Sequence, residues 1–184
     1  MGQSFYAVIR NRERHYCYAP IYTPDLTDPT GGGCGMKMTE HAYMDNTFVL
    51  AVASKLYRRP HRLAWVGDES EPAEFEKNGT PVEAGRKIFD LLPRRDDKVL
   101  SPSNFSFKGK FVANHIKKLF LNMDKFIAKY AGKARFLICP LPYLVSVGYG
   151  YTDGGIGSWA WDVISVQNAP PTGFAEYTVP FMRD

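Results

Sequence analysis

The polar residues best suited to chemistry lie in one short segment, Asn114-His115-Ile116-Lys117-Lys118. A histidine beside two cations is pushed toward its neutral imidazole form, and a neutral imidazole suits a general base. We therefore expect His115, oriented by Asn114 or a carboxylate, to remove a proton while Lys117 or Lys118 steadies an anion. The alternative is a hairpin or helix turn whose polar residues face water.

Two aspartates are the carboxylates that could orient His115. Asp68 ends the segment Trp65-Val66-Gly67-Asp68, and Asp162 ends Trp159-Ala160-Trp161-Asp162, so each follows a strand-like stretch. If the two carboxylates met, they could hold a divalent cation or share a proton. Each could equally cap a turn by accepting backbone N–H bonds. The sequence therefore gives His115, Asp68 and Asp162 as candidate catalytic residues and commits to no metal ion and no cofactor.

A glycine-rich stretch, Gly148–Gly157, is the expected binding loop. Its glycines can adopt backbone angles closed to other residues and can let a ligand or another backbone come close. Backbone N–H groups there could cradle a phosphate, although the pattern is neither GxxxxGK[ST] nor GxGxxG. Its aromatic residues could stack on bases or enter a protein partner, and a plain crossover loop is the alternative. The candidate ligand-binding residues in or beside this loop and the histidine segment are Asn114, Lys117, Lys118, Gly148, Gly150, Tyr151, Asp153, Gly155 and Trp159.

Basic residues form two regions of the chain. Arg58, Arg59, His61 and Arg62 follow an expected helix, whose dipole favours cations at its C-terminus. Lysines interleaved with phenylalanines recur from Lys108 onward. If both regions share a face, they predict binding of a phosphate backbone with a steep salt dependence. The formal net charge of +4 is too small to name a nucleic-acid partner, which stays open.

Length and composition are those of a globular protein. With 184 residues, of which 45% are hydrophobic and 23% charged, the chain is expected to form a single domain, residues 1–184. Its three cysteines are far apart and have no metal-ligand spacing, which favours a reducing, cytoplasmic location. No segment reaches the about 18 apolar residues that would span a bilayer. Cys34, in another glycine-rich segment, is the one candidate nucleophile among the cysteines, and a small residue in a flexible loop is the blander interpretation.

Strand and helix patterns alternate along the chain. The segments with strand character are Ser4–Arg10, His15–Tyr18, Met36–Glu40, Arg62–Val66, Arg135–Cys139, Tyr143–Val147, Ser158–Val166 and Phe174–Val179. Asp45 is expected to cap a helix over Asn46–Tyr57, and Thr80 to cap a second helix that ends before Pro93. Residues 110–130 fit either one long helix or a hairpin around Lys117-Lys118 followed by a helix. These patterns predict an α+β fold, a mostly antiparallel mixed sheet of five to seven short strands flanked by two or three helices.

The chain resembles a family of bacterial and bacteriophage proteins of similar length that begin Met-Gly-Gln. The blocks that carry this resemblance are Met1-Gly2-Gln3, Gly35–Val52, Ala64–Asp68, Phe111–Lys118, Pro140–Leu144 and Gly157–Val166. The sequence departs from the family pattern at Ile116, where a threonine is expected, and in its glycine loop, which lacks an arginine. The resemblance favours the hairpin for residues 110–130 and implies a cytosolic single domain, but it carries no established activity.

These features lead to two expectations for function. The first is a cytosolic binding protein that engages a macromolecular partner or a phosphate-bearing ligand through the glycine loop and the neighbouring His115, Lys117 and Lys118. The second is a small hydrolase or transferase that uses His115 with Asp68 or Asp162. An enzyme requires His115 within hydrogen-bond reach of a carboxylate in a concave pocket. A binding protein requires an exposed aromatic and charged surface instead.

Overall fold

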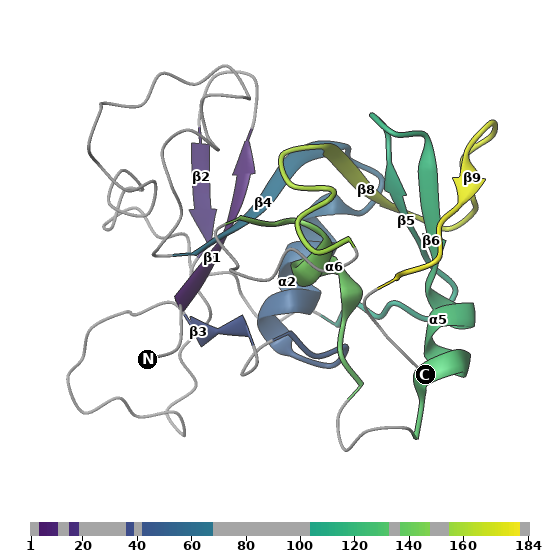
Figure 1. Cartoon of the computed structure of the whole chain (residues 1–184), viewed down its shortest axis with the longest axis horizontal. Coiled ribbons are helices and arrows are strands. Elements are labelled where there is room, and N and C mark those ends of the chain that lie inside the picture. The colour runs from purple at the N-terminus through teal and green to yellow at the C-terminus, as the bar shows by residue number, and fades with distance from the viewer. Residues whose placement is uncertain are drawn as a thin grey trace.

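The computed structural model describes residues 4–10, 15–18, 36–38, 42–67, 104–132, 137–147 and 155–180. These residues form one mixed sheet with three helices, which confirms the predicted α+β fold (Figure 1). Its strands are β1 (Ser4–Arg10), β2 (His15–Tyr18), β3 (Met36–Lys37), β4 (His61–Gly67), β5 (Phe111–Asn114), β6 (Leu119–Asn122), β7 (Ser146–Val147), β8 (Val163–Gln167) and β9 (Ala175–Glu176).

The sheet is mostly antiparallel, as predicted. Its main path runs β2-β1-β4-β8-β5-β6-β9, with the short strands β3 and β7 pairing beside β1 and β4. Only the pairs β4–β7 and β6–β9 are parallel among the strands described. β8 comes late in the chain but lies between β4 and β5, so it joins the N-terminal strands to the β5–β6 hairpin (Figure 1).

The hairpin alternative for residues 110–130 is confirmed. β5 and β6 pair antiparallel with Val112 opposite Leu121, and helix α5 (Met123–Tyr130) follows directly. The side chain of Asn122 caps that helix by accepting a hydrogen bond from the backbone N–H of Lys125. The apolar residues of this region fit a β-hairpin followed by a capped helix, and the same spacing would also fit one long helix.

Helix α2 (Thr47–Leu56) lies at the predicted position but its cap differs from the prediction. Asn46, not Asp45, is the N-cap: its side-chain oxygen accepts hydrogen bonds from the backbone N–H groups of Phe48 and Val49. Either residue type can cap a helix. The observed cap is the residue whose backbone is extended immediately before the first helical turn.

Two predicted strands begin later than expected: the one over Tyr143–Val147 is only the short strand β7, and its first two residues belong to a helix. Pro140–Leu144 is the short helix α6, because a proline at the first helical position already has the required φ angle and lacks an N–H that would otherwise be unpaired. The strand expected over Ser158–Val166 begins only at Val163. Gly157 and Trp161 have φ angles of 71° and 62°, and these left-handed residues turn the chain before β8.

The two faces of the sheet differ in how they are covered. All three described helices contribute buried apolar residues to the larger core, which packs on the face carrying Trp65, Val112 and Ile164. The opposite face, here called the outer face, has a small apolar cluster near β1 and β4, centred on Val66 and Trp161. Strand alternation thus separates a helix-covered face from one that no described helix covers.

Several predictions lie outside the described residues, namely the loop 20–35, Asp68, the second helix and residues 148–154 of the glycine loop. Within the described residues, none of the helices has the length and apolar character needed to cross a bilayer.

Candidate functional site

Asn114 is a fully buried polar residue at the end of β5, where it organises the hairpin turn. Its side-chain oxygen accepts hydrogen bonds from the backbone N–H groups of Ile116 and Lys117, both 3.0 Å away. Its side-chain nitrogen donates to Oδ2 of Asp162 at 2.8 Å. A buried amide whose donor and acceptor both have partners fixes the turn without leaving a desolvated polar group.

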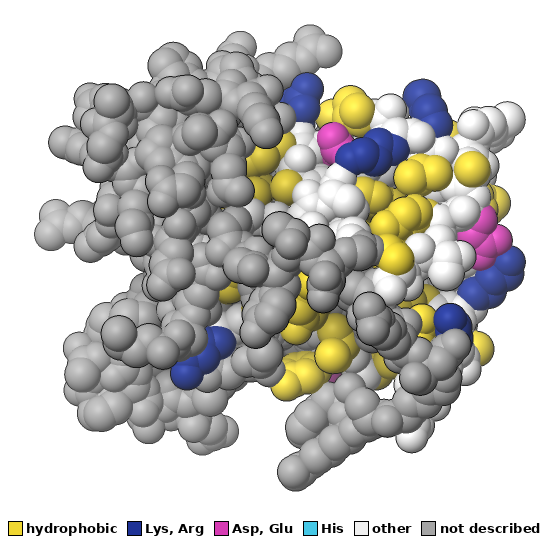
Figure 2. All heavy atoms as spheres, viewed as in Figure 1, with side chains coloured by type: hydrophobic (Ala, Val, Ile, Leu, Met, Phe, Trp, Pro, Cys, Tyr) yellow, Lys and Arg dark blue, Asp and Glu magenta, His cyan; other side chains and the backbone are white. Residues whose placement is uncertain are grey.

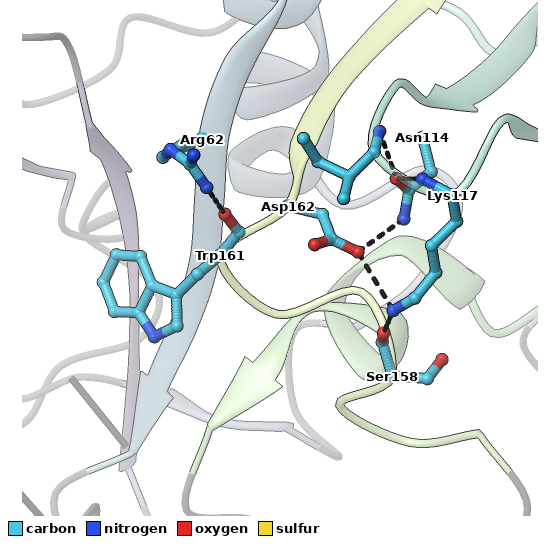
Figure 3. Close-up of polar contacts among 7 residues, drawn as sticks. Arg62, Asn114, Lys117, Ser158, Trp161 and Asp162 are labelled. Atoms are coloured by element: carbon cyan, nitrogen blue, oxygen red, sulfur yellow. Dashed lines mark hydrogen bonds and ion pairs between the residues drawn. The ribbon is translucent and has the colours of Figure 1, made fainter. Parts of the chain in front are cut away.

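Asp162 is the second member of this group and is bound from two sides (Figure 3). Besides the amide of Asn114, its Oδ2 lies 3.1 Å from Nζ of Lys117. The same Nζ donates to the backbone carbonyl of Ser158. We call Asn114, Lys117, Ser158 and Asp162 the clasp, because they tie the β5–β6 turn to the segment that leads into β8.

The clasp brings together three of the residues predicted from the sequence, Asn114, Lys117 and Asp162, and pairs the two charged side chains with each other. The carboxylate of Asp162 is 16% exposed and the side chain of Lys117 is 41% exposed, so the ion pair is partly screened from water. Both contacts of the carboxylate are to Asn114 and Lys117, and His115 is bonded to Ser165 instead of to Asp162. This geometry is that of a structural tie between two segments.

His115 points to the other face of the sheet from Asn114, since neighbouring strand residues alternate. Its Nε2 lies 2.8 Å from Oγ of Ser165, and the side chain of Gln167 donates to the same oxygen at 2.8 Å. The hydroxyl of Ser165 can donate to Nε2 of a neutral His115 in the tautomer that carries its proton on Nδ1, and can accept from Nε2–H in the other tautomer. Partial burial, reinforced by Lys118, lowers the pKa of His115 below its usual range, in agreement with that neutral form.

Ser165 is a polar residue that the sequence reasoning missed. A serine hydroxyl bonded to a histidine resembles the first half of a nucleophile–base pair. However, Ser165 lies in the middle of β8 and is 0% exposed, so no substrate can reach its oxygen in this conformation. Among the described residues, no carboxylate lies within hydrogen-bond distance of His115 to complete a triad.

The described end of the glycine loop is packed against the chain's own C-terminal segment. A Cβ added at Gly155 would lie 2.8 Å from Pro180 and 2.9 Å from the hydroxyl of Tyr177. Trp159 is buried and its ring packs on Tyr177, with centroids 5.2 Å apart. The contacts of Gly155 and Trp159 therefore explain their residue types through close packing. The remaining loop candidates, Gly148, Gly150, Tyr151 and Asp153, lie outside the described residues, as does Asp68.

A second polar and aromatic group forms where β8 ends and β5 begins. Tyr57 donates a hydrogen bond from its hydroxyl to Asn168 at 2.9 Å, and its ring meets Phe105 edge to face at 5.9 Å. The guanidinium of Arg58 and the Nζ of Lys110 lie 5.1 and 5.4 Å from the centre of the same ring. We call these five residues the Tyr57 cluster.

The Tyr57 cluster joins the two basic regions of the sequence. Arg58 belongs to the run after α2, and Lys110 belongs to the lysine-rich region that precedes β5. Within the part of the chain that the structure describes, neither cation has an ion-pair partner. One residue from each basic region therefore lies beside this ring.

Metal chemistry has no counterpart in the described residues, where no group of three or more histidine, cysteine, aspartate or glutamate side chains could hold an ion. Cys139 is fully buried, and burial raises the pKa of its thiol to about 12, which leaves it unreactive. Comparison of the whole chain with protein-family models, with curated proteins and with solved structures gave no match.

Proposed function

We propose that this chain is a binding protein that engages a phosphate-bearing macromolecular partner through the Tyr57 cluster. The observation that carries the proposal is the convergence of Arg58 and Lys110, from distant segments, on the ring of Tyr57. Two cations without acidic partners at one place form a ready site for anions. A surface of this kind fits an extended polyanion better than it fits a small substrate, because nothing described encloses it.

The cluster is positioned before any partner arrives. The hydroxyl of Tyr57 is held by Asn168, and the backbone N–H of Arg58 donates to the carbonyl of Val166 at 2.8 Å. A cation that packs against a fixed ring loses less freedom on binding an anion than a lysine or arginine extended into water. Restricting the side chains in advance therefore favours affinity.

One face of the molecule has a described surface that is basic and apolar, which suits a polyanion (Figure 2). Figure 2 shows Lys and Arg side chains interspersed with hydrophobic side chains over the described part of one face, with few Asp or Glu side chains among them. The formal net charge of +4 acts in the same direction. Phosphate contacts made by these cations would release counterions, so binding should weaken steeply as salt increases.

The proposal includes a cytoplasmic location. It is supported by three widely spaced cysteines and by Cys139, a buried free thiol.

The test is a binding titration with labelled inorganic polyphosphate, between about 50 and 200 mM salt. The double variant Arg58→Ala/Lys110→Ala should weaken binding about tenfold and reduce the salt dependence. The matched control, Lys125→Ala/Lys129→Ala, removes the same charge from α5 and should have a much smaller effect. Equal losses in both variants, or no binding by the unchanged protein, would rule out the Tyr57 cluster as the site.

A hydrolase that uses His115 is the second candidate, favoured by the 2.8 Å contact between its Nε2 and Ser165. The complete burial of Ser165 argues against it. Hydrolysis of an activated aryl ester separates the two cases. We expect no rate that depends on Ser165 or His115, whereas a loss of turnover in Ser165→Ala would establish the enzyme.

A further inference from the structure

The outer face of the sheet carries a row of aromatic side chains over β5 and β6. Phe111 and His115 share this face because they are separated by an even number of strand positions. Phe120, directly opposite Ala113 in the neighbouring strand, shares it as well. Phe111 and Phe120 are only partly buried and contact each other edge to face at 5.8 Å. Neither belongs to a core cluster, so their rings are not needed to fill the interior.

The row continues onto the C-terminal segment. Phe174 meets the imidazole of His115 edge to face at 5.4 Å, and Nζ of Lys118 lies 5.0 Å from the centre of the Phe174 ring. Backbone bonds hold this segment against β6, since Ala175 donates to the carbonyl of Lys118 at 2.9 Å. Rings from three segments are thus fixed side by side on one surface.

The floor between the rings is polar and rigid. Ser165 is buried beneath His115 and Gln167, which both bond its hydroxyl. That arrangement leaves the second ring nitrogen of His115, Nδ1, and the amide oxygen of Gln167 available for hydrogen bonds. Both atoms lie on the same face as the rings, because Gln167 is directly opposite Phe111 in the sheet.

Cations stand at both ends of β5. Lys118 lies beside Phe174 at the hairpin end of the outer face. Lys110, in the Tyr57 cluster, immediately precedes Phe111, so strand alternation places it toward the helix-covered face, against whose core Tyr57 packs. The strand between these ends, residues 111–115, spans about 14 Å at about 3.4 Å per residue. This arrangement fits a chain of phosphates with flat groups attached. The flat groups would lie against the rings of the outer face, and the phosphates would contact Lys118 at one end and pass around the start of β5 to Lys110 at the other.

We propose that the outer face binds single-stranded nucleic acid. Bases stack on Phe111 and Phe120, and Lys118 holds phosphates at the hairpin end. The Tyr57 cluster holds phosphates at the other end, where the bound strand passes around the start of β5. The inference rests on the proposed function and specifies its partner. A single strand fits because its base faces are accessible, whereas those of a duplex are stacked on one another. A protein partner would not need, at both ends of this strand, cations that have no ion-pair partner among the described residues.

Fluorescence anisotropy tests this with an oligothymidylate of about 12 nucleotides and an abasic strand of the same length. The base-bearing strand should bind the full chain about tenfold more tightly than the abasic strand. Phe111→Leu/Phe120→Leu should abolish that difference and leave abasic binding unchanged. Ile116→Ala removes the exposed apolar side chain at the hairpin tip, 54% exposed, and should change neither. Circular dichroism establishes that each variant is folded.

A second variant, Phe111→Trp, keeps an aromatic ring at this position and measures base stacking directly. The indole fluorescence of Phe111→Trp should be quenched by oligothymidylate but not by the abasic strand. Equal affinity for the two strands, no quenching, or binding only to anionic lipid vesicles would overturn this inference. If polyphosphate and the abasic strand still bind through Arg58 and Lys110, the proposed function stands without it. If no polyanion binds at all, both fail together.

Discussion

The clasp and the Tyr57 cluster both contain polar residues that join distant segments. They differ in whether their charged side chains have an ion-pair partner among the described residues. In the clasp, the side chains of Asn114 and Asp162 spend their hydrogen bonds on the protein itself, and Lys117 neutralises the carboxylate. In the Tyr57 cluster, Arg58 and Lys110 face an aromatic ring and no described acid opposes them. The clasp was the more conspicuous site in the sequence, yet the Tyr57 cluster keeps charge available for a partner.

This difference separates polar residues that stabilise a fold from those that serve recognition. A buried polar group must be paired within the protein, because leaving it unpaired costs about 1–3 kcal/mol. A half-exposed cation near a ring carries no such penalty and can exchange water for a phosphate. Polar and charged groups that are not paired within the protein are therefore a better guide to a binding site than the density of polar residues in the sequence.

Asn114→Ala gives the largest contrast between the two regions. It removes the acceptor of two backbone N–H groups and leaves Lys117 as the remaining partner of Asp162, so the free energy of unfolding should fall by about 2–3 kcal/mol. Arg58→Ala, the comparison in the Tyr57 cluster, should lower it by less than about 1 kcal/mol. Urea unfolding measures both. Equal losses would mean that the clasp is no more structural than the cluster.

Gly157→Ala tests how tightly the segment before β8, which the clasp holds, is packed. Its φ angle is 71°, and an added Cβ would lie 2.8 Å from the carbonyl oxygen of Ser146. Gly109 is the matched control, with a φ angle of 67° and no atom within 4 Å of an added Cβ.

Alanine at Gly109 should cost about 1 kcal/mol of stability from backbone strain alone, and alanine at Gly157 about 2 kcal/mol. Thermal unfolding of the two variants isolates the cost of the close contact. A larger loss at Gly109 would contradict the packing described for this turn.

The smallest expected effect is a pH dependence that involves the outer face. Burial lowers the pKa of both His61 and His115, with Arg59 and Lys118 as the second causes. A lowered folded-state pKa means that the unfolded chain binds protons first as pH falls below about 6.5. Stability should therefore be unaffected by these groups above that pH and should decline below it.

His115→Gln keeps a polar side chain beside Ser165 but removes the titration. Its unfolding free energy should change less between about pH 7.5 and pH 5.5 than that of the unchanged protein. Asn114→Ala, a clasp variant without a titrating group, should keep the full pH dependence. An unaltered pH profile in His115→Gln would mean that this imidazole is not held neutral.

Elements with a local signal were predictable from the sequence. The α2 helix and the β1–β2 hairpin lie where apolar spacing placed them. The β5–β6 hairpin was one of two alternatives, because the same apolar residues satisfy a helical and an alternating pattern. The α6 helix was not predicted, because its five residues are too few to show a helical spacing, although a proline such as Pro140 begins a helix well.

The site was harder to predict because its contacts cross long sequence separations. Asn114, Lys117 and Asp162 were named from the sequence, and the structure brings them together, but as a closed tie. Ser165 gave no signal, since a serine in an alternating strand is ordinary until the register places it beside His115. The Tyr57 cluster depends on β8 bringing residue 168 next to the end of α2, a pairing that no local pattern encodes.

The position of β8 has a consequence for how the molecule is made. Synthesis proceeds from the N-terminus, and β8 is the strand that lies between β4 and β5. The first four strands and the later hairpin consequently have no shared edge until residues 163–167 leave the ribosome. A nascent chain shorter than this holds two separate half-sheets with unpaired edges, and such edges favour aggregation. Folding of the finished chain should be slow, because its central pairing closes long loops.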